Sequence, residues 1–454
     1  MTKPSLPQGT RDFDATIVYK RNFILNTIKS VFELYGFQPL ETPAFENIET
    51  LMGKYGDEGD KLIFKILNNG LDNSEKHTQI REDFELILKG KNTKGLTERA
   101  LRYDLTIPFA RYVAMNHGQL TFPFKRYQIQ PVWRADRPQK GRYREFYQCD
   151  VDVVGSNSLL NEIEFCHIYQ AVFSKLSIPN FTIQINHRKI LTALADLCGA
   201  SDKMNLLTTC IDKLDKIGLQ KVKEELLSKG FNATQIKLVE DYLSINGTNE
   251  EKVKSLSNLF STNADAKIAI EEIKTILNKK PEALNLQLDF TLARGLNYYT
   301  GIIFEAKGPE NVKMGSISGG GRYDDLTKLF GVPNIPGVGI SFGVDRIYDV
   351  MEELNLFPKT VGNGTRVLFF NLGEDESAAS LQLMQQLRNQ NINCELFHEN
   401  LKFDKQFKYA EKKQIPFIVI IGGQELLDKT CTIKNLQSGK QETILQKNLV
   451  DFSF

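Results

Sequence analysis

The first residues that could do chemistry form an arginine-rich segment between two apolar segments. Residues 134–144 read RADRPQKGRYR, and the aromatic residues Phe146 and Tyr147 follow closely. An arginine guanidinium matches phosphate oxygens or a base edge, because its donors form a planar fork. A charged segment of this kind is also common as a plain solvated turn. The apolar flanks and the aromatic residues favour contact with a nucleotide or a nucleic acid.

Two other segments combine glycines with polar and aromatic residues. Residues 292–301 read LARGLNYYTG, and residues 318–324 read SGGGRYD. Glycine lets the backbone approach a ligand closely, although glycine runs also form ordinary turns. The first segment could equally be a strand-edge turn with packed tyrosines. Neither is a P-loop, because no Gly-Lys-Ser or Gly-Lys-Thr follows.

These residues must be positioned by regular elements. Residues 17–35 place apolar side chains at helical spacing, and Gly36 predicts the end of that helix. An extended segment over 37–43 follows. Residues 124–133 and 146–154 are predicted strands on either side of the arginine-rich turn, which makes that turn the loop of a hairpin. Further strand-like segments are 302–304 and 338–340.

The second half of the chain changes character twice. Residues 190–280 are rich in Leu, Lys, Glu and Asn at helical spacing, which predicts a helical insertion. Residues 362–365 are a linker candidate. Beyond them, strands alternate with helices, which is typical of a small α/β domain with a largely parallel sheet. The predicted elements are strand 367–371, helix 376–390, strand 392–397, helix 403–413 and strand 416–421.

Composition limits the classes of protein that fit. The chain has 454 residues, enough for about three domains. The net charge of +1 indicates neither a nucleic-acid binder nor a membrane-surface protein, so nucleic-acid contacts must come from local basic patches. The six cysteines form no C-x-x-C pair and have no zinc spacing, which predicts reduced thiols and no metal cluster. Residues 1–7 lack the apolar segment of a signal peptide, and no apolar run could cross a bilayer. We therefore expect a cytoplasmic protein.

Several motifs together resemble one family. The helix and extended segment over 17–43 resemble motif 1 of the class II aminoacyl-tRNA synthetases, residues 134–148 resemble motif 2, and GVGISFGVDR at 337–346 resembles motif 3. Three shorter strings resemble signatures of the histidyl-tRNA synthetases: GTRD at 9–12, RGLNYY at 294–299 and SGGGRY at 318–323. The resemblance spans nearly the whole chain.

The resemblance implies an α+β fold. It predicts a class II catalytic domain on an antiparallel sheet over 1–360, with the helical insertion at about 190–280, and a C-terminal α/β anticodon-binding domain over 366–454. It implies a ligase that activates L-histidine with ATP and transfers it to tRNA(His). Mg²⁺ is expected on the ATP phosphates, with no protein ligand assigned. Motif 1 implies a homodimer, for which the apolar stripe of the 17–35 helix would supply the surface.

The resemblance also assigns roles to individual residues. Arg134 and Arg294 would contact the α-phosphate as catalytic residues, and Arg346 would stack on adenine and reach the γ-phosphate. Arg137 and Gln139 would read an extra 5′ guanosine of the tRNA, because an arginine fork matches a guanine edge. The histidine-binding residues would be Asp104, Leu105, Thr106, Gln148, Asp152, Tyr298 and Tyr299.

The chain departs from the common family pattern at three positions. Asp104 and Asp152 stand where glutamate is common, and Asn297 stands where aspartate is common. A shorter carboxylate still accepts hydrogen bonds but reaches less far, so these changes affect the geometry of the site.

Two other functions fit parts of the pattern. One is the synthetase-like regulatory subunit of ATP phosphoribosyltransferase, and the other is a tRNA-binding or signalling module without catalysis. The C-terminal α/β domain and the arginine signature at 294–299 oppose the first. The intact ATP-site arginines oppose the second.

Overall fold

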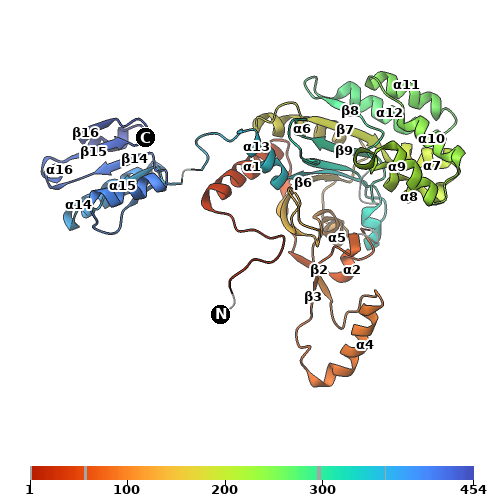
Figure 1. The fold of residues 1–454 in the computed structure, drawn as a ribbon, viewed down its shortest axis with the longest axis horizontal. Coiled ribbons are helices and arrows are strands. Elements are labelled where there is room, and N and C mark those ends of the chain that lie inside the picture. Colours follow the sequence, from red (N-terminus) through yellow and green to blue (C-terminus); the bar gives the residue numbers. More distant parts are fainter. Residues whose placement is uncertain (1–2, 56–58, 294–297, 363) are drawn as a thin grey trace. The chain divides into compact units, whose positions relative to one another are not determined.

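The computed structural model describes residues 3–55, 59–293, 298–362 and 364–454. The chain forms two compact units, one of Met1–Asp12 with Arg21–Phe357 and one of Phe13–Lys20 with Pro358–Phe454. Figure 1 shows the elements of both units along the chain. Among the helices that the structure describes, none is both long and apolar enough to cross a membrane.

The first unit is built on a sheet in the order β1-β5-β6-β11-β10-β9-β7-β8. The β1–β5 and β7–β8 pairs at its two edges are parallel, and the pairs between them are antiparallel. The predicted hairpin over 124–154 is confirmed as β5 and β6. The strands are β1 Gln38–Pro39, β5 Phe124–Trp133, β6 Glu145–Val154, β7 Thr182–His187, β8 Leu286–Leu288, β9 Ile302–Lys307, β10 Ser318–Arg322 and β11 Gly337–Gly343.

Helices α1 (Ala15–Leu34), α6 (Leu160–Lys175) and α13 (Val344–Glu353) pack on the apolar side of this sheet. The predicted helix over 17–35 is thus confirmed as α1. Its apolar stripe, however, lies inside the chain's own core, where Ile24, Ile28 and Val31 are fully buried. That stripe is therefore not a surface for a second copy. A helix laid on a sheet stabilises the unit best when its apolar face is buried there.

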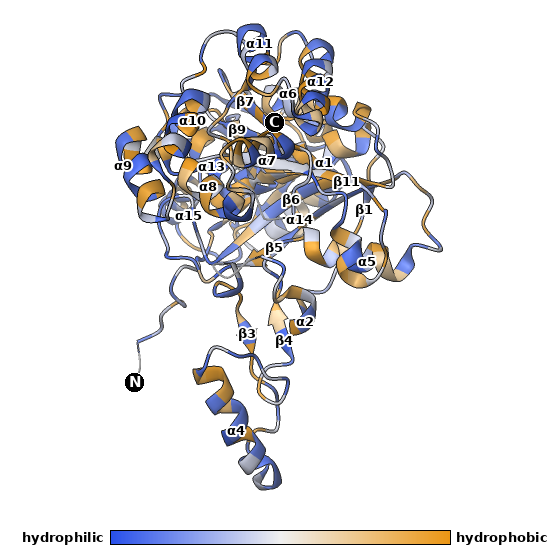
Figure 2. Cartoon of the chain, turned by 90° about the vertical axis from the view of Figure 1, so that its right-hand side faces the viewer, coloured by the Kyte–Doolittle hydropathy of each residue, from blue (hydrophilic) through white to orange (hydrophobic). Residues whose placement is uncertain are grey.

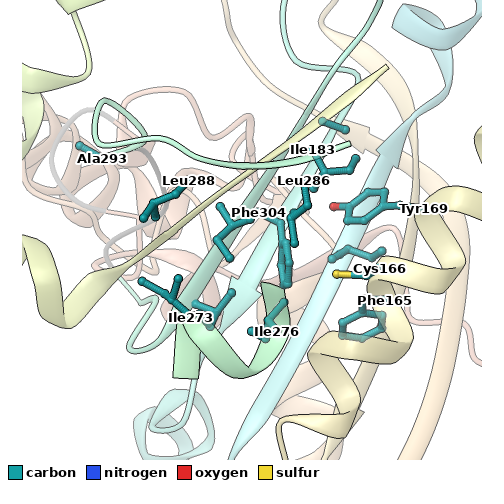
Figure 3. Close-up of a cluster of buried hydrophobic side chains, with 14 of the residues drawn as sticks. Phe165, Cys166, Tyr169, Ile183, Ile273, Ile276, Leu286, Leu288, Ala293 and Phe304 are labelled. Atoms are coloured by element: carbon teal, nitrogen blue, oxygen red, sulfur yellow. The ribbon is translucent and has the colours of Figure 1, made fainter. Parts of the chain in front are cut away.

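The helical insertion is observed between β7 and β8. Two of its helices begin at residues that favour a helix start. Asn232 and Thr248 form capping boxes at the N-termini of α10 and α11. The insertion shares the core of the sheet: Ile273 and Ile276 of α12 lie close to Phe304 of β9 (Figure 3). The helices are α7 Arg188–Leu197, α8 Met204–Ile211, α9 Leu214–Ser228, α10 Ala233–Leu243, α11 Asn249–Leu259 and α12 Ala264–Lys279.

A smaller sheet in the first unit was not predicted. It has the order β2-β4-β3 and carries helix α4, which projects away from the large sheet (Figures 1 and 2). Helix α5, which follows β4, begins at the segment expected to bind histidine. The elements are β2 Phe45–Asn47, α2 Ile48–Leu51, β3 Lys65–Ile66, α4 His77–Leu88, β4 Arg99–Leu101 and α5 Thr106–Asn116.

The second unit contains an α/β domain with a sheet in the order β13-β12-β14-β15-β16. Its first three strands are parallel, as predicted, and each predicted strand and helix from 367 to 421 is observed. The antiparallel hairpin β15–β16 extends the sheet beyond the prediction. The elements are β12 Val367–Phe369, α14 Glu374–Asn389, β13 Cys394–Leu396, α15 Phe403–Lys412, β14 Phe417–Ile420, α16 Gly423–Asp428, β15 Thr430–Asn435 and β16 Gln441–Leu445.

Candidate active site

Three neighbouring strands of the large sheet carry polar side chains on one face. Successive side chains of a strand point to opposite faces. Cys149, Val151 and Val153 of β6 join the apolar core, so the even-numbered residues of β6 lie on the other face. Strand register continues this polar face across β5, β6 and β11 in three rows, which are Arg126–Asp152–Gly339, Gln128–Asp150–Ser341 and Gln130–Gln148–Gly343.

Glycines make room for the large side chains above this face. A Cβ at Gly339 would lie 1.9 Å from Oδ1 of Asp152, and a Cβ at Gly337 would lie 2.3 Å from the ring of Tyr323. A Cβ at Gly321 would lie 3.0 Å from the ring of Tyr299. The glycine-rich strands β10 and β11 are therefore the floor of the site, because only glycine permits these approaches.

A small polar cavity lies above this floor. It is lined by Thr106, Asp152 and Tyr299, which the resemblance assigned to histidine, and also by Asp150 and Tyr323. The structure therefore brings together residues that are up to about two hundred positions apart in the chain. The cavity shares Gly319 and Ser341 with a larger cleft, so the two adjoin.

Asp104 is held at the start of α5. Its Oδ1 accepts hydrogen bonds from the hydroxyl of Tyr55 at 2.9 Å and from the backbone N–H of Ile107 at 3.1 Å. Its Oδ2 is buried and has no hydrogen-bond partner in the described part of the chain. Burial raises the pKa of Asp104, while the Ile107 N–H and the Arg134 charge oppose that rise. Leu105 beside it is fully buried and offers only its backbone.

Asp152 belongs to a buried group of charges. Its Oδ2 lies 2.8 Å from Nη2 of Arg126, whose side chain is fully buried, and its Oδ1 accepts a hydrogen bond from the hydroxyl of Tyr323. Burial raises the pKa of Asp152, and Arg126 and Tyr323 act in the opposite direction. The Arg126 guanidinium also lies 4.0 Å from the ring centroid of Phe109.

Tyr298 and Tyr299 pack edge to face, with ring centroids 4.9 Å apart. Burial raises the pKa of both hydroxyls, so both are protonated at neutral pH and can donate hydrogen bonds. Gln148 lines the larger cleft, and its Nε2 donates to the hydroxyl oxygen of Ser341 at 3.2 Å.

The larger cleft has a volume of about 490 Å³ and contains two of the assigned arginines. Nε of Arg134 donates to the backbone oxygen of Tyr103 at 3.0 Å, and its guanidinium lies 4.2 Å from the Tyr103 ring and 5.2 Å from the Phe146 ring. Arg346 donates to the backbone oxygens of Gly141 at 2.9 Å and Ser316 at 2.6 Å. Both guanidinium groups are thus oriented before any ligand arrives.

The GTRD segment lies at the same cleft. The guanidinium of Arg11 stacks 3.2 Å from the ring centroid of Tyr143, and it forms a salt bridge with Asp345 at 2.6 Å. Arg21 of α1 forms a second salt bridge with the same carboxylate. The start of the chain therefore braces the arginine-rich loop against motif 3.

The remaining residues singled out in the sequence are not among those that line the cavity or the cleft in the described structure. Arg137 and Gln139 are exposed and do not line the cleft. The backbones of Gln139 and Arg142 exchange hydrogen bonds of 3.1 and 2.9 Å, which fold the loop on itself. Arg294 and Asn297 lie outside the described residues.

Several residues that contact the assigned side chains or line the cavity were not predicted from the sequence. They are Tyr55, Arg126, Gln128, Asp150 and Tyr323. The predicted hairpin could have indicated Arg126, because the register of its two strands places Arg126 opposite Asp152. Within the described ranges, no group of three or more His, Cys, Asp or Glu residues could hold a metal ion.

An antiparallel sheet that carries a polar, glycine-floored cavity beside a cleft with oriented arginines defines the catalytic unit of a class II aminoacyl-tRNA synthetase. Residues 70–347 match the family model described as Histidyl-tRNA synthetase, and residues 366–452 match the model described as Anticodon binding domain. The chain belongs to the histidyl-tRNA synthetase family.

Individual relatives agree with this assignment. The histidine–tRNA ligase of Christiangramia forsetii is 52% identical and that of Flavobacterium johnsoniae is 50% identical, with at least 97% of each chain covered. The crystal structure of histidyl-tRNA synthetase from Nostoc sp. PCC 7120 has a TM-score of 0.82 at 31% identity, covering 99% of both chains. An ATP phosphoribosyltransferase regulatory subunit/histidyl-tRNA synthetase from Bacillus halodurans has a TM-score of 0.70 at 20% identity, which shows the shared fold alone.

Proposed function

We propose that this chain activates L-histidine with ATP at the adjoining cavity and cleft, and then transfers histidine to tRNA(His). One observation carries the proposal: a small cavity lined by the buried carboxylates of Asp150 and Asp152 adjoins a cleft with oriented arginines. Polar side chains line the cavity, which suits a polar amino acid, and the arginines of the cleft have the charge to hold a triphosphate.

In the first step, the histidine carboxylate attacks the α-phosphorus of ATP and pyrophosphate leaves. Both reactants are anionic, so fixed cations must hold them together and stabilise the charge that shifts. Arg134 is suited to the α-phosphate, because its stacking between Tyr103 and Phe146 fixes the guanidinium plane. Arg346 is suited to the adenine and γ-phosphate. When bound, Mg²⁺ would neutralise phosphate charge, with the phosphates as its main ligands.

Recognition of histidine requires partners at both ends of the substrate. Asp104, Thr106 and Gln148 would hold the α-ammonium group, and the buried Oδ2 of Asp104 is an acceptor that such a donor can satisfy. Asp152 and Tyr299, which line the cavity, would meet the imidazole ring. A buried polar site rejects analogues that cannot pair with it, which gives selectivity without an editing domain.

Arg294 remains a catalytic residue in this proposal by resemblance. We expect Arg294→Ala to keep the fold and to lose on the order of a hundred- to thousandfold of the adenylation rate. Single-turnover adenylate formation and thermal melting on one preparation test this. Near-wild-type adenylation by the folded variant would remove Arg294 from catalysis.

The tRNA would contact the exposed motif 2 loop and the second unit. Arg137 and Gln139 are exposed and so accessible to a 5′ guanosine. In the second unit, Lys402, Lys405 and Lys408 are exposed on or beside α15 and could meet anticodon-arm phosphates. A solvated helix face is the alternative explanation for these lysines. Lys413 is less available, because it pairs with Glu395 at 3.2 Å.

Assembly as a homodimer is also part of the proposal. Because the apolar stripe of α1 is buried, a dimer surface must use other residues, and Leu34 at the end of α1 is 73% exposed. Sedimentation equilibrium at micromolar concentration tests this: a monomer contradicts the dimer. A cytoplasmic location stays a prediction from the sequence.

The decisive experiment is histidine-dependent ATP–pyrophosphate exchange, with the other amino acids as controls. Exchange with histidine alone supports the proposal. Histidine binding without exchange would instead indicate the regulatory paralogue, and tRNA binding without either would indicate a tRNA-binding module.

A further inference from the structure

We propose that Arg11 is a positioning residue for adenylate formation, because it joins the motif 2 loop (residues 134–144) to motif 3. The inference rests on the proposed function and deepens it. It gives a role to the GTRD segment at 9–12, which the resemblance had matched without assigning any of its residues.

Arg11 contacts both motifs through a single guanidinium group. The guanidinium carbon lies 3.2 Å from the ring centroid of Tyr143, in the returning half of the loop. Its Nη2 lies 2.6 Å from Oδ1 of Asp345, at the start of α13. Tyr143 and Asp345 line the larger cleft, whereas Arg11 does not. Arg11 therefore lies behind the wall of the cleft and can act on a ligand only through these two residues.

The segment around Arg11 also follows the backbone of the loop. The N–H of Arg144 donates to the oxygen of Gly9 at 2.9 Å, and the N–H of Arg134 donates to the oxygen of Arg144 at 2.9 Å. Gly9 has a φ of +84°, and a Cβ there would lie 2.8 Å from Cγ of Arg144, so this close approach requires glycine. Two consecutive hydrogen bonds thus connect the N-terminal segment to the arginine proposed for the α-phosphate.

The motif 3 end of the link is fixed by a second element. Asp345 also forms a salt bridge with Arg21 of α1 and is 6% exposed, so two arginines hold this carboxylate. Its neighbour in the chain, Arg346, donates from Nε to the oxygen of Gly141 at 2.9 Å. The loop therefore meets motif 3 twice, once directly at Arg346 and once through Arg11.

Adenylate formation needs this link, because Arg134 and Arg346 are proposed to contact different phosphates of one ATP. The distance between the two guanidinium groups must match the triphosphate, and the contacts between the loop and motif 3 set that distance. A misplacement of about 1 Å can cost on the order of 100-fold in rate. Arginine suits position 11, because its flat guanidinium can stack on a ring while its edge binds a carboxylate.

The test measures single-turnover adenylate formation at saturating ATP and L-histidine. The rate constant refers to each active site, even when part of a preparation is inactive. The variants are Arg11→Ala, Arg11→Lys, Tyr143→Ala and the double variant Arg11→Ala/Tyr143→Ala. Lys223→Ala in the helical insertion is the matched control. Lys223 is 33% exposed and pairs with Glu240 at 3.1 Å, and Arg11 is similarly 27% exposed with an acidic partner.

We expect Arg11→Ala to lower the adenylation rate on the order of 10- to 100-fold, because the loop loses one of its two links to motif 3. The KM for histidine should stay within about twofold of wild type, because residues of other elements line the small cavity. Arg11→Lys keeps the charge for Asp345 without the flat stack, so its rate should be intermediate. Tyr143→Ala should lower the rate by itself but add little to Arg11→Ala, because both changes remove the same contact. The control should match wild type.

Several outcomes would overturn the inference while leaving the proposed function intact. One is a wild-type adenylation rate in Arg11→Ala or in Arg11→Lys. Another is a pair of losses in Arg11→Ala and Tyr143→Ala that multiply in the double variant, which makes the two residues independent. A third is a lowered melting temperature and a smaller active fraction with an unchanged rate per active site, which makes Arg11 structural. Absence of histidine-dependent exchange in the wild type would instead refute the proposed function itself.

Discussion

Replacing Arg126 with methionine tests the buried charge group most directly. Arg126 is fully buried, and its Nη2 lies 2.8 Å from Oδ2 of Asp152. Nη1 donates to Oε1 of Gln128 at 3.3 Å, and the guanidinium lies against Phe109. Methionine keeps much of the length and the apolar contact with Phe109, so the main loss is the positive charge.

The magnitude follows from the short distance and the burial. Two unit charges about 2.8 Å apart attract by about 6 kcal/mol at an effective dielectric constant of about 20, before desolvation is subtracted. Removal of one partner from a buried pair typically costs about 3–5 kcal/mol, because the other charge stays buried without compensation. At about 2 °C per kcal/mol for a unit of this size, the melting temperature of Arg126→Met should fall by about 6–10 °C.

The loss should depend on pH with a definite sign. Burial already holds the pKa values of Asp150 and Asp152 above their ordinary range, and Arg126 limits that rise. Without Arg126, the folded-state values rise further above the unfolded value of about 3.9. The folded state then binds more protons than the unfolded state, so stability falls as pH rises through the folded-state pKa. The melting difference from wild type should therefore be larger at pH 8 than at pH 5.

Thermal melting between pH 5 and pH 8 measures this difference, and Arg126→Met combined with Asp152→Asn is the matched control. The double variant removes both charges and should recover much of the lost stability at pH 8. A loss in Arg126→Met that is the same at both pH values would refute the electrostatic reasoning. Failure of the double variant to recover would refute the pairing with Asp152.

Three other predictions concern the floor of the site and its partners. Gly320→Ala should destabilise the first unit by at least about 1–3 kcal/mol in thermal melting, because its Cβ would lie 2.1 Å from the backbone oxygen of Gly339; an unchanged melting temperature contradicts the strand register. Arg137→Ala should lose about 10- to 100-fold of the discrimination against tRNA without the 5′ guanosine and keep pyrophosphate exchange; equal discrimination in aminoacylation assays assigns the contact elsewhere. Truncation after Val361 should spare pyrophosphate exchange and weaken tRNA charging, and full charging by the truncated chain would show that residues 362–454 are not needed for it.

Local patterns were sufficient for much of the fold. Hydrophobic periodicity and turn residues predicted three parts of the fold: the hairpin of β5 and β6, helix α1 and the alternating elements from 367 to 421. Each of these patterns depends only on residues that are close together in the sequence. The small sheet that carries α4 was not predicted, since strands of two or three residues leave no recognisable period. The β15–β16 hairpin was likewise missed.

The sequence by itself determined the family, the types of side chain at the site and most of the long elements. Tertiary structure alone decided which of those side chains meet. Arg126 and Asp152 become partners only through the register of β5 on β6, and Tyr323 reaches the same carboxylate from the end of β10. Tertiary structure also decided what covers the apolar stripe of α1. The spacing of its apolar residues is the same whether the helix packs on its own sheet or on a second copy. Periodicity records that a face is apolar, but the partner of that face is set by long-range packing, which no local pattern encodes.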